Sequence, residues 1–257
     1  MDSNDSSNEL ARRGFVTLNQ LLTIPFVRAL NLALAAAEES CAETRARRNL
    51  RDADGSAHHL PVFRGPFLEL LEDTHLDRVI RAYFGGPFIL NSYGASVNRP
   101  GVRSYLHNLH RDVRSFTQDV RLMLNVLVML DDFTIENGAT YFLSGSHLSP
   151  DRPAVEHWEG IAERATGRAG DVVFFDSRLW HAAAPNLTQQ VRRGLTLTFT
   201  PPFMKPQFDY PRALGYDDGE QFNDRLREVL GYDSRVPASL DEWYRPPEQR
   251  FYRAGQG

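Results

Sequence analysis

Three residues could together bind a divalent metal ion: His110, Asp112 and His181. His110 and Asp112 lie at the end of a strand-like run, and residues i and i+2 of a strand project to the same side. His181 follows the predicted strand Asp171 to Phe175. Two imidazoles and one carboxylate on one face of an octahedron leave three positions open, which suits iron(II). A His-X-Asp sequence is common by chance, and His181 could be a core histidine, so spacing alone leaves metal-binding and structural roles both open.

The predicted strand 192–200 carries the next candidate. Alternation places Arg192 on a small, polar face with Thr196, and Arg193 on an apolar face with Leu195. The polar face leaves room for a ligand, and an arginine there could bind a carboxylate through two parallel hydrogen bonds. An ordinary surface ion pair is the alternative role for Arg192. If Arg192 binds the ligand, Arg193 is the arginine that reaches solvent or a loop.

The predicted elements that must position these residues change from helices to β-strands near residue 86. Residues 1–8 are a polar tail that we expect to be disordered. Apolar residues at three- and four-residue spacing predict helices over 9–22, 26–48 and 67–85 within a helical part 9–86. The core 87–205 holds short runs rich in β-branched and aromatic residues: FILNSYGASV, YLHNLHRDV, VRLMLNVLVML, ATYFLS, DVVFFD and GLTLTFT. Strands without regular βα alternation predict a mainly β fold, an antiparallel sandwich with flanking helices, followed by a helical and extended segment 206–257.

Composition narrows the class of protein. A chain of 257 residues with 42% hydrophobic residues can form a sizeable core, and we expect one domain over 9–257. The net charge of −4 gives no reason to expect nucleic acid or an anionic membrane as a partner. The single cysteine, Cys41, excludes an internal disulfide. With no basic or apolar leader and no long apolar run, we expect a cytoplasmic protein, as a monomer or small homo-oligomer.

A set of motifs occurs around these residues: His110-Arg111-Asp112, the segment ENGATYFLSGSH at 136–147, GDVVFFD at 170–176, then His181, Pro185-Asn186 and Arg192-Arg193. At these motifs the chain resembles the phytanoyl-CoA dioxygenase family of iron(II)/2-oxoglutarate-dependent oxygenases. The resemblance covers roughly residues 10–205, in family order and at family-like spacing. It implies a double-stranded β-helix, a cupin-like jelly roll, that holds iron and 2-oxoglutarate inside one open end.

The resemblance also implies roles for individual residues. His110, Asp112 and His181 would be the metal ligands, and Arg192 would pair with the distal carboxylate of 2-oxoglutarate. Asn125 is the lone polar residue of an apolar strand, and a buried amide needs a partner. It would either hydrogen-bond to the cosubstrate or be a satisfied core amide. Where many relatives carry a hydroxyl residue two positions after the second histidine, this chain has Ala183. The further candidates for contacts with the cosubstrate are Thr196, Tyr93, Asn91 and Thr140.

The implied activity is that of a dioxygenase that consumes O2 and converts 2-oxoglutarate to succinate and CO2. Hydroxylation of an unactivated C–H bond is the default outcome, and ring closure, desaturation or epimerisation are alternatives. Halogenating relatives replace the carboxylate ligand with a small residue, so Asp112 disfavours halogenation. Two other classes stay open: a cupin-like metalloenzyme that does not use 2-oxoglutarate, and a binding protein that has lost turnover.

The expected substrate is a small metabolite, such as a natural-product intermediate of antibiotic or secondary-metabolite biosynthesis. Lys205 is the only lysine, so no basic lysine-rich patch indicates a coenzyme A thioester. Polar and aromatic residues mix around the expected site, which favours a small polar or ring-containing molecule. The residues that we expect to face the substrate are His107, Arg114, Phe116, Trp180, Arg178 and His58.

Overall fold

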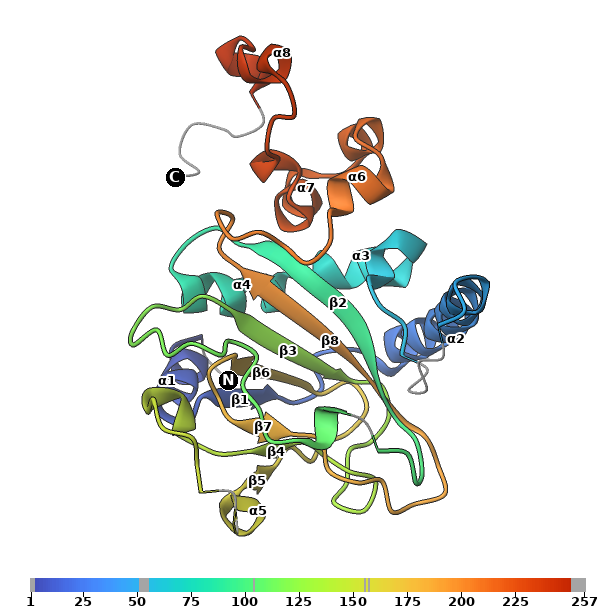
Figure 1. The fold of residues 1–257 in the computed structure, drawn as a ribbon, viewed down its shortest axis with the longest axis vertical. Coiled ribbons are helices and arrows are strands. Elements are labelled where there is room, and N and C mark those ends of the chain that lie inside the picture. The colour runs from blue at the N-terminus through green and yellow to red at the C-terminus, as the bar shows by residue number, and fades with distance from the viewer. Residues whose placement is uncertain (1–2, 51–55, 104, 155, 157, 251–257) are drawn as a thin grey trace.

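The structure is a computed structural model that describes residues 3–50, 56–103, 105–154, 156 and 158–250. A five-stranded sheet in the order β1-β6-β3-β8-β2 packs against a three-stranded sheet in the order β5-β4-β7 (Figure 1). Neighbouring strands are antiparallel throughout both sheets. The strands are β1 (Phe15–Leu18), β2 (Ile89–Asn98), β3 (Leu124–Met129), β4 (Tyr141–Phe142), β5 (Glu163–Arg164), β6 (Val172–Asp176), β7 (His181–Ala182) and β8 (Arg192–Thr200).

Helices cover the outer face of the five-stranded sheet (Figure 1). Leu30 and Leu34 of α2, Ile80 of α4 and Val229 of α7 belong to one buried cluster with Leu197 of the sheet. The helices are α1 (Ser3–Arg13), α2 (Ile24–Arg47), α3 (Pro66–Leu71), α4 (Thr74–Phe84), α5 (Trp158–Ile161), α6 (Tyr210–Leu214), α7 (Asp224–Leu230) and α8 (Leu240–Trp243). Single 3-10 turns lie at Leu60–Phe63, Tyr105–His107, Ser146–Leu148, Asp217–Gln221, Tyr232–Ser234 and Pro247–Gln249.

The inner face of the five-stranded sheet forms a second core with the smaller sheet. Phe142 of β4 packs there on Phe15 of β1 and Phe175 of β6, with ring centroids 4.8 and 5.0 Å apart. Strand β3 lies in the middle of the larger sheet and is buried along its whole length. Both of its faces meet apolar layers, which explains why its sequence does not alternate between apolar and polar residues. In the sequence, the run from Leu122 to Leu130 is apolar on both faces, which predicts a strand buried between two layers, and β3 confirms this prediction.

Two expectations about the N-terminus are wrong. Residues 3–8 belong to helix α1 instead of a disordered tail, because Ser6 and Leu10 are buried and because Arg13 and Ala11 accept hydrogen bonds from Gly145 and His147. Met1 and Asp2 of that expected tail lie outside the described residues.

The helix predicted over 9–22 is also divided. Gly14 has φ +83°, and a Cβ there would lie 2.6 Å from Nδ1 of His147, so only glycine allows the chain to leave α1 at this point. The following residues form β1, whose backbone pairs with β6 from Phe15 opposite Phe175 to Leu18 opposite Val172. None of the helices in the described part of the chain has the length and apolar character that a membrane span requires.

Candidate metal centre

The backbone brings the two histidines of the triad together. His181 begins β7, and His110 lies opposite it in an isolated antiparallel bridge. Each backbone N–H donates to the carbonyl of the other residue at 3.0 Å. The run 105–113, expected to be a strand, is therefore a 3-10 turn followed by this single bridge. The bridge is sufficient, because it sets the two imidazoles side by side with ring centroids 4.3 Å apart.

The ligand atoms of the triad converge on one point. Nε2 of His110 lies 3.6 Å from Oδ1 of Asp112, and Nε2 of His181 lies 3.6 Å from Oδ2. One ligand atom from each of the three residues can be chosen so that all lie within 4.8 Å of one another. Within the described residues this is the one such group of histidine, cysteine and carboxylate side chains. Two nitrogens and a hard oxygen at this spacing fit a first-row divalent metal ion.

Neighbouring carbonyls orient both imidazoles. Nδ1 of His110 lies 2.7 Å from the carbonyl of Asn108, and Nδ1 of His181 lies 2.9 Å from that of Leu179. Since a carbonyl only accepts, each Nδ1 carries the proton and each Nε2 directs its lone pair at the centre. Burial lowers the pKa of His181, and the negative charge of Asp112 opposes this shift. His181 is therefore held in the neutral form that a metal ligand requires.

Asp112 is held through its backbone and its side chain. Its N–H donates to the carbonyl of Ser177 at 3.1 Å. Its Oδ2 accepts a hydrogen bond of 2.7 Å from the amide of Asn125, whose own oxygen accepts from Thr198 at 2.9 Å. Of the two roles expected for Asn125, the structure favours the satisfied amide, whose partners are the carboxylate of Asp112 and the hydroxyl of Thr198. No signal in the sequence links residues 112 and 125, because only the fold brings them together.

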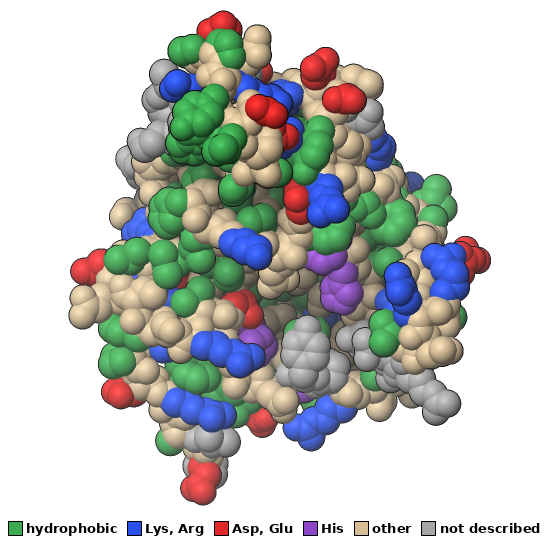
Figure 2. Space-filling model, turned by 45° about the horizontal axis from the view of Figure 1, so that its top comes forward, with side chains coloured by type: hydrophobic (Ala, Val, Ile, Leu, Met, Phe, Trp, Pro, Cys, Tyr) green, Lys and Arg blue, Asp and Glu red, His purple; other side chains and the backbone are tan. Residues whose placement is uncertain are grey.

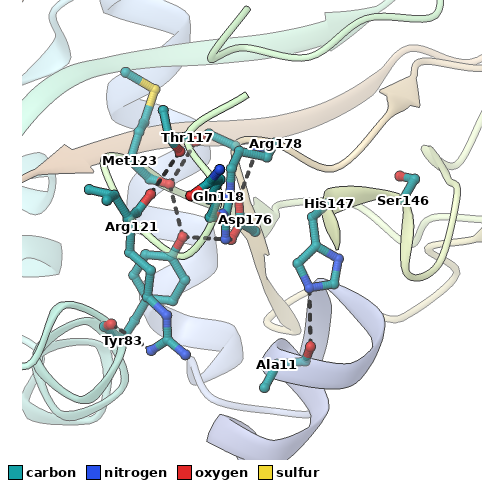
Figure 3. Close-up of polar contacts among 12 residues, drawn as sticks. Ala11, Tyr83, Thr117, Gln118, Arg121, Met123, Ser146, His147, Asp176 and Arg178 are labelled. Atoms are coloured by element: carbon teal, nitrogen blue, oxygen red, sulfur yellow. Dashed lines mark hydrogen bonds and ion pairs between the residues drawn. The ribbon is translucent and has the colours of Figure 1, made fainter. Parts of the chain in front are cut away.

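A buried polar network supports the loop that carries Asp112 (Figure 3). Arg178 pairs with Asp176 at 2.7 Å, and Tyr83 donates to the same carboxylate at 2.8 Å. Burial alone would raise the pKa of Asp176, but the hydrogen bonds from Arg178 and Tyr83 outweigh it and the pKa is lowered. Arg178 also donates to the carbonyl of Gln118. The expectation that Arg178 faces the substrate is corrected: its guanidinium is buried and joins β6 to the 112–123 loop.

Arg192 lies on the inner face of the sheet and is only 1% exposed. Its guanidinium lies 4.0 Å from the ring centroid of Phe133, donates to the carbonyl of Gly138 at 2.8 Å and lies 3.5 Å from the hydroxyl of Ser96. Its Nε has no hydrogen-bond partner among the described residues. Burial lowers the pKa of Arg192 to about 10, so it stays charged at neutral pH. Arg193 instead pairs with an aspartate on the surface, and its side chain is 41% exposed.

The other residues expected to contact the cosubstrate separate into two groups. Thr196 lies on the Arg192 face, where its hydroxyl is 3.5 Å from the carbonyl of Gly94. Tyr141 pairs with Ala182, and continuing that register by one residue places Thr140 opposite Ala183, on the His181 face. Tyr93 and Asn91 do not reach the triad, and both expectations are corrected.

The reason is the geometry of β2. Tyr93 points to the helix-covered side, where its ring meets Phe67 at 6.0 Å. Asn91 sits in a β-bulge and donates to the carbonyl of Lys205 at 3.4 Å. Ser96, which the sequence reasoning missed, shares the inner face with Ser92 and Gly94 because these residues alternate with Tyr93. The alternation of small residues with apolar ones along β2 is the sequence signal that could have placed Ser96 on the inner face.

Four of the residues expected to face the substrate lie on three separate segments of the chain. His58 lies beside β2, where its backbone forms an isolated bridge with Gly94. A Cβ atom added to Gly94 would lie 3.2 Å from Nδ1 of His58. The exposed imidazole of His58 therefore lies on the inner side of the sheet. Arg114 and Phe116 are exposed in the 112–123 loop, and His107 ends a 3-10 turn. Figure 2 shows histidine side chains around a hollow on one face, with basic side chains nearby.

Trp180 does not join this group. The guanidinium of Arg111 covers its ring at 4.8 Å, and the ring packs against the buried cluster that contains Trp158. Arg111 in turn donates to the carbonyls of Ser146 and Ser149. Trp180 therefore helps to fix the turn after β4, and its contact with substrate stays a prediction.

A jelly-roll sandwich with two histidines and one carboxylate at its inner face defines a cupin-like non-haem metalloprotein. The model of the family described as "Phytanoyl-CoA dioxygenase (PhyH)" matches residues 27–194. An uncharacterised protein of Mycobacterium tuberculosis is 35% identical over 196 residues, covering 74% of this chain and 71% of the relative. The dioxygenase cdmA of Talaromyces verruculosus is 31% identical over 173 residues, covering 63% of this chain and 56% of the relative.

Solved structures agree on the fold. AviO1 from Streptomyces viridochromogenes superposes with a TM-score of 0.62 at 25% identity, covering 80% of this chain and 97% of the other. The α-ketoglutarate-dependent epimerase SnoN from nogalamycin biosynthesis gives 0.56 at 19% identity, covering 77% and 80%. The chain belongs to the phytanoyl-CoA dioxygenase family. It is a non-haem iron(II)/2-oxoglutarate-dependent dioxygenase that uses O2, and the predicted jelly roll is confirmed.

Proposed function

We propose that this enzyme hydroxylates an unactivated C–H bond of a small metabolite, with His110, Asp112 and His181 as the iron ligands. The observation that carries the proposal is the convergence of three ligand atoms within 4.8 Å of one another. The buried guanidinium of Arg192, on the inner face of the larger sheet, supports it. Iron(II) with bound 2-oxoglutarate supplies the oxidising chemistry when both are present. The protein supplies the ligands, their orientation and the exclusion of water.

The residues around the triad fit this metal. Both imidazoles present Nε2, and Asp112 presents one carboxylate, which together occupy three positions. Three positions then remain, which is the number that a bidentate cosubstrate and O2 require. Phe142 and Phe175 lie 6.2 and 5.0 Å from the His181 ring, centroid to centroid. These apolar neighbours keep one side of the centre dry.

Arg192 fits the distal carboxylate of 2-oxoglutarate. A guanidinium that is 1% exposed and has no carboxylate within ion-pair distance among the described residues is a charge that lacks a counterion. Its Nε is also a buried donor without a partner in this part of the chain. A bound carboxylate would satisfy both needs through a bidentate pair. Thr196 and Thr140 are further candidates for contacts along the cosubstrate, in place of a hydroxyl at Ala183.

The substrate that we propose is a natural-product intermediate. Two structural relatives are named for such pathways, the epimerase SnoN and the carbocyclase SnoK from nogalamycin biosynthesis. Their names also support ring closure or epimerisation as alternative outcomes for this chain. Asp112 argues against halogenation, since its carboxylate takes the position that a halide would need. His58, Arg114 and Phe116 are the residues that we propose to contact the substrate, because each is exposed.

The test is the spectrum of the anaerobic protein. Addition of iron(II) and then 2-oxoglutarate should give a weak visible metal-to-ligand charge-transfer band in the wild type. His181→Ala should lose both iron binding and the band, whereas His75→Ala, at an exposed ion pair with Asp73 on α4, should keep both. Iron bound by the triad without any band on addition of 2-oxoglutarate would instead favour a metalloenzyme that does not use this cosubstrate.

A further inference from the structure

We propose that Asn125 and Thr198 are positioning residues that hold Asp112 as a single-oxygen metal ligand. The inference rests on the proposed function, since it concerns the same iron site. It starts from four contacts around one carboxylate: Asn125 to Asp112 at 2.7 Å, Thr198 to Asn125 at 2.9 Å, and Asp112 to each of the two histidines at 3.6 Å.

The sheet register makes this pair of residues neighbours. Asn125 of β3 lies directly opposite Thr198 of β8, so their side chains leave the same face of the sheet. On its other side Asn125 lies opposite Phe175 of β6, whose ring offers no hydrogen-bonding group. Asn125 is 5% exposed and has little access to water. Its amide therefore depends on Asp112 and Thr198 for its hydrogen bonds.

Hydrogen-bond chemistry fixes which way the amide faces. The carboxylate of Asp112 can only accept, so the NH2 group of Asn125 must face it. The oxygen of Asn125 then faces Thr198, whose hydroxyl must donate. A rotated amide would set its oxygen against the carboxylate and lose that contact, so Asp112 selects the orientation in which Asn125 donates to it. Thr198 donates to the amide oxygen in this orientation and holds the amide group in place.

The consequence concerns the number of coordination positions. With Oδ2 engaged by Asn125, Asp112 presents Oδ1 as the oxygen free for the metal. A carboxylate that bound through both oxygens would take a fourth position and leave two. A bidentate cosubstrate and O2 need three. Asn125 therefore protects the position that the reaction requires, and it acts through Asp112 without touching substrate.

The test measures metal binding in addition to turnover. Asn125→Leu removes the donor at similar volume, and Thr198→Val removes the hydroxyl that orients the amide. Thr200→Val is the matched control, because Thr200 lies two residues from Thr198 on the same face of β8 and its buried hydroxyl has no hydrogen-bond partner among the described residues. Co(II) affinity by anaerobic titration should fall roughly 10-fold or more in Asn125→Leu and a few-fold in Thr198→Val. It should stay at the wild-type value in Thr200→Val.

The charge-transfer band separates positioning from simple folding. Loss of the hydrogen bond makes Asp112 a stronger electron donor, so the band of the iron(II)/2-oxoglutarate complex should move to longer wavelength in Asn125→Leu. Equal Co(II) affinity in all three variants would overturn the proposal, and so would weaker affinity with an unmoved band. If Asn125→Leu does not fold, Thr198→Val decides by the same two measurements. Failure of wild-type protein to bind metal through His181 would instead overturn the proposed function and, with it, this inference.

Discussion

Replacing Arg192 by methionine should remove most of the response to 2-oxoglutarate while changing the stability of the ligand-free protein only slightly. The side chain is 1% exposed, and burial lowers its pKa to about 10, well below the usual range of an arginine. At about 1.36 kcal/mol per pKa unit, burial disfavours the charged form by roughly 3 kcal/mol. Methionine removes that cost and fills a similar volume beside Phe133.

One loss acts against this gain in the ligand-free protein. The carbonyl of Gly138 loses a donor at 2.8 Å, and a hydrogen bond from a charged group contributes about 1.5–3 kcal/mol. The ligand-free variant should therefore lie within about 1–2 kcal/mol of the wild type. Removing one partner of a buried carboxylate–guanidinium pair costs about 2 kcal/mol or more. The affinity for 2-oxoglutarate should thus fall at least roughly 30-fold in Arg192→Met.

Urea unfolding of the Co(II)-loaded protein, with and without 2-oxoglutarate, measures both effects. At a concentration about 100 times the wild-type Kd, the cosubstrate should add about 2.7 kcal/mol to the wild type and less than about 1 kcal/mol to Arg192→Met. Arg193→Met is the control, since its surface pair with Asp131 is worth little and it should keep the full response. Equal responses in the two variants would refute the assignment of the two faces of β8.

Two further predictions concern buried groups around the site. Arg178→Met should destabilise the protein by about 3–5 kcal/mol in urea unfolding, because it leaves the carboxylate of Asp176, itself 2% exposed, without its cation. The double variant with Asp176→Leu should recover part of this loss, and a loss below about 1 kcal/mol in the single variant would contradict the argument. Burial lowers the pKa of His147 in the folded state. The unfolded chain then binds protons more readily, so this part of the stability is complete above about pH 6.5 and is lost as the pH falls from there toward the lower folded pKa. Unfolding measured between about pH 7.5 and 5.5 should show a shallower decline for His147→Gln than for the wild type, and equal slopes would argue against a buried neutral histidine.

The sequence predicted the features that depend on local periodicity. Alternation along 192–200 separated Arg192 from Arg193, and the structure finds one buried and the other exposed at the surface. The apolar run of β3 indicated a strand covered on both faces, and that is where it lies. Both predictions use only neighbours within one strand, and side-chain direction in a strand follows from position alone.

Features that depend on distant partners were out of reach. Arg178 looked like a substrate ligand because nothing nearby in the sequence shows that Tyr83 and Gln118 lie around its ion pair with Asp176. Residues 15–18 continue an apolar pattern that suits a helix, yet in the structure they form a strand that pairs with β6. Gly14 allows the chain to leave α1 and enter this strand. In both cases tertiary contacts override a local preference.

The short segment with Ala57 and His58, the latter a residue that we propose to contact the substrate, also covers an edge of the larger sheet. Strand β2 is at the end of the five-stranded sheet, and a sheet edge with free backbone groups is a template for pairing with other chains. Ala57 and His58 cover part of that edge: Ala57 accepts from the N–H of Ala95 at 2.8 Å, and His58 bridges Gly94. A designer who replaces this segment to admit a larger substrate would uncover the edge as well. Widening the entrance of this enzyme therefore calls for a replacement segment that keeps the backbone bond to Ala95.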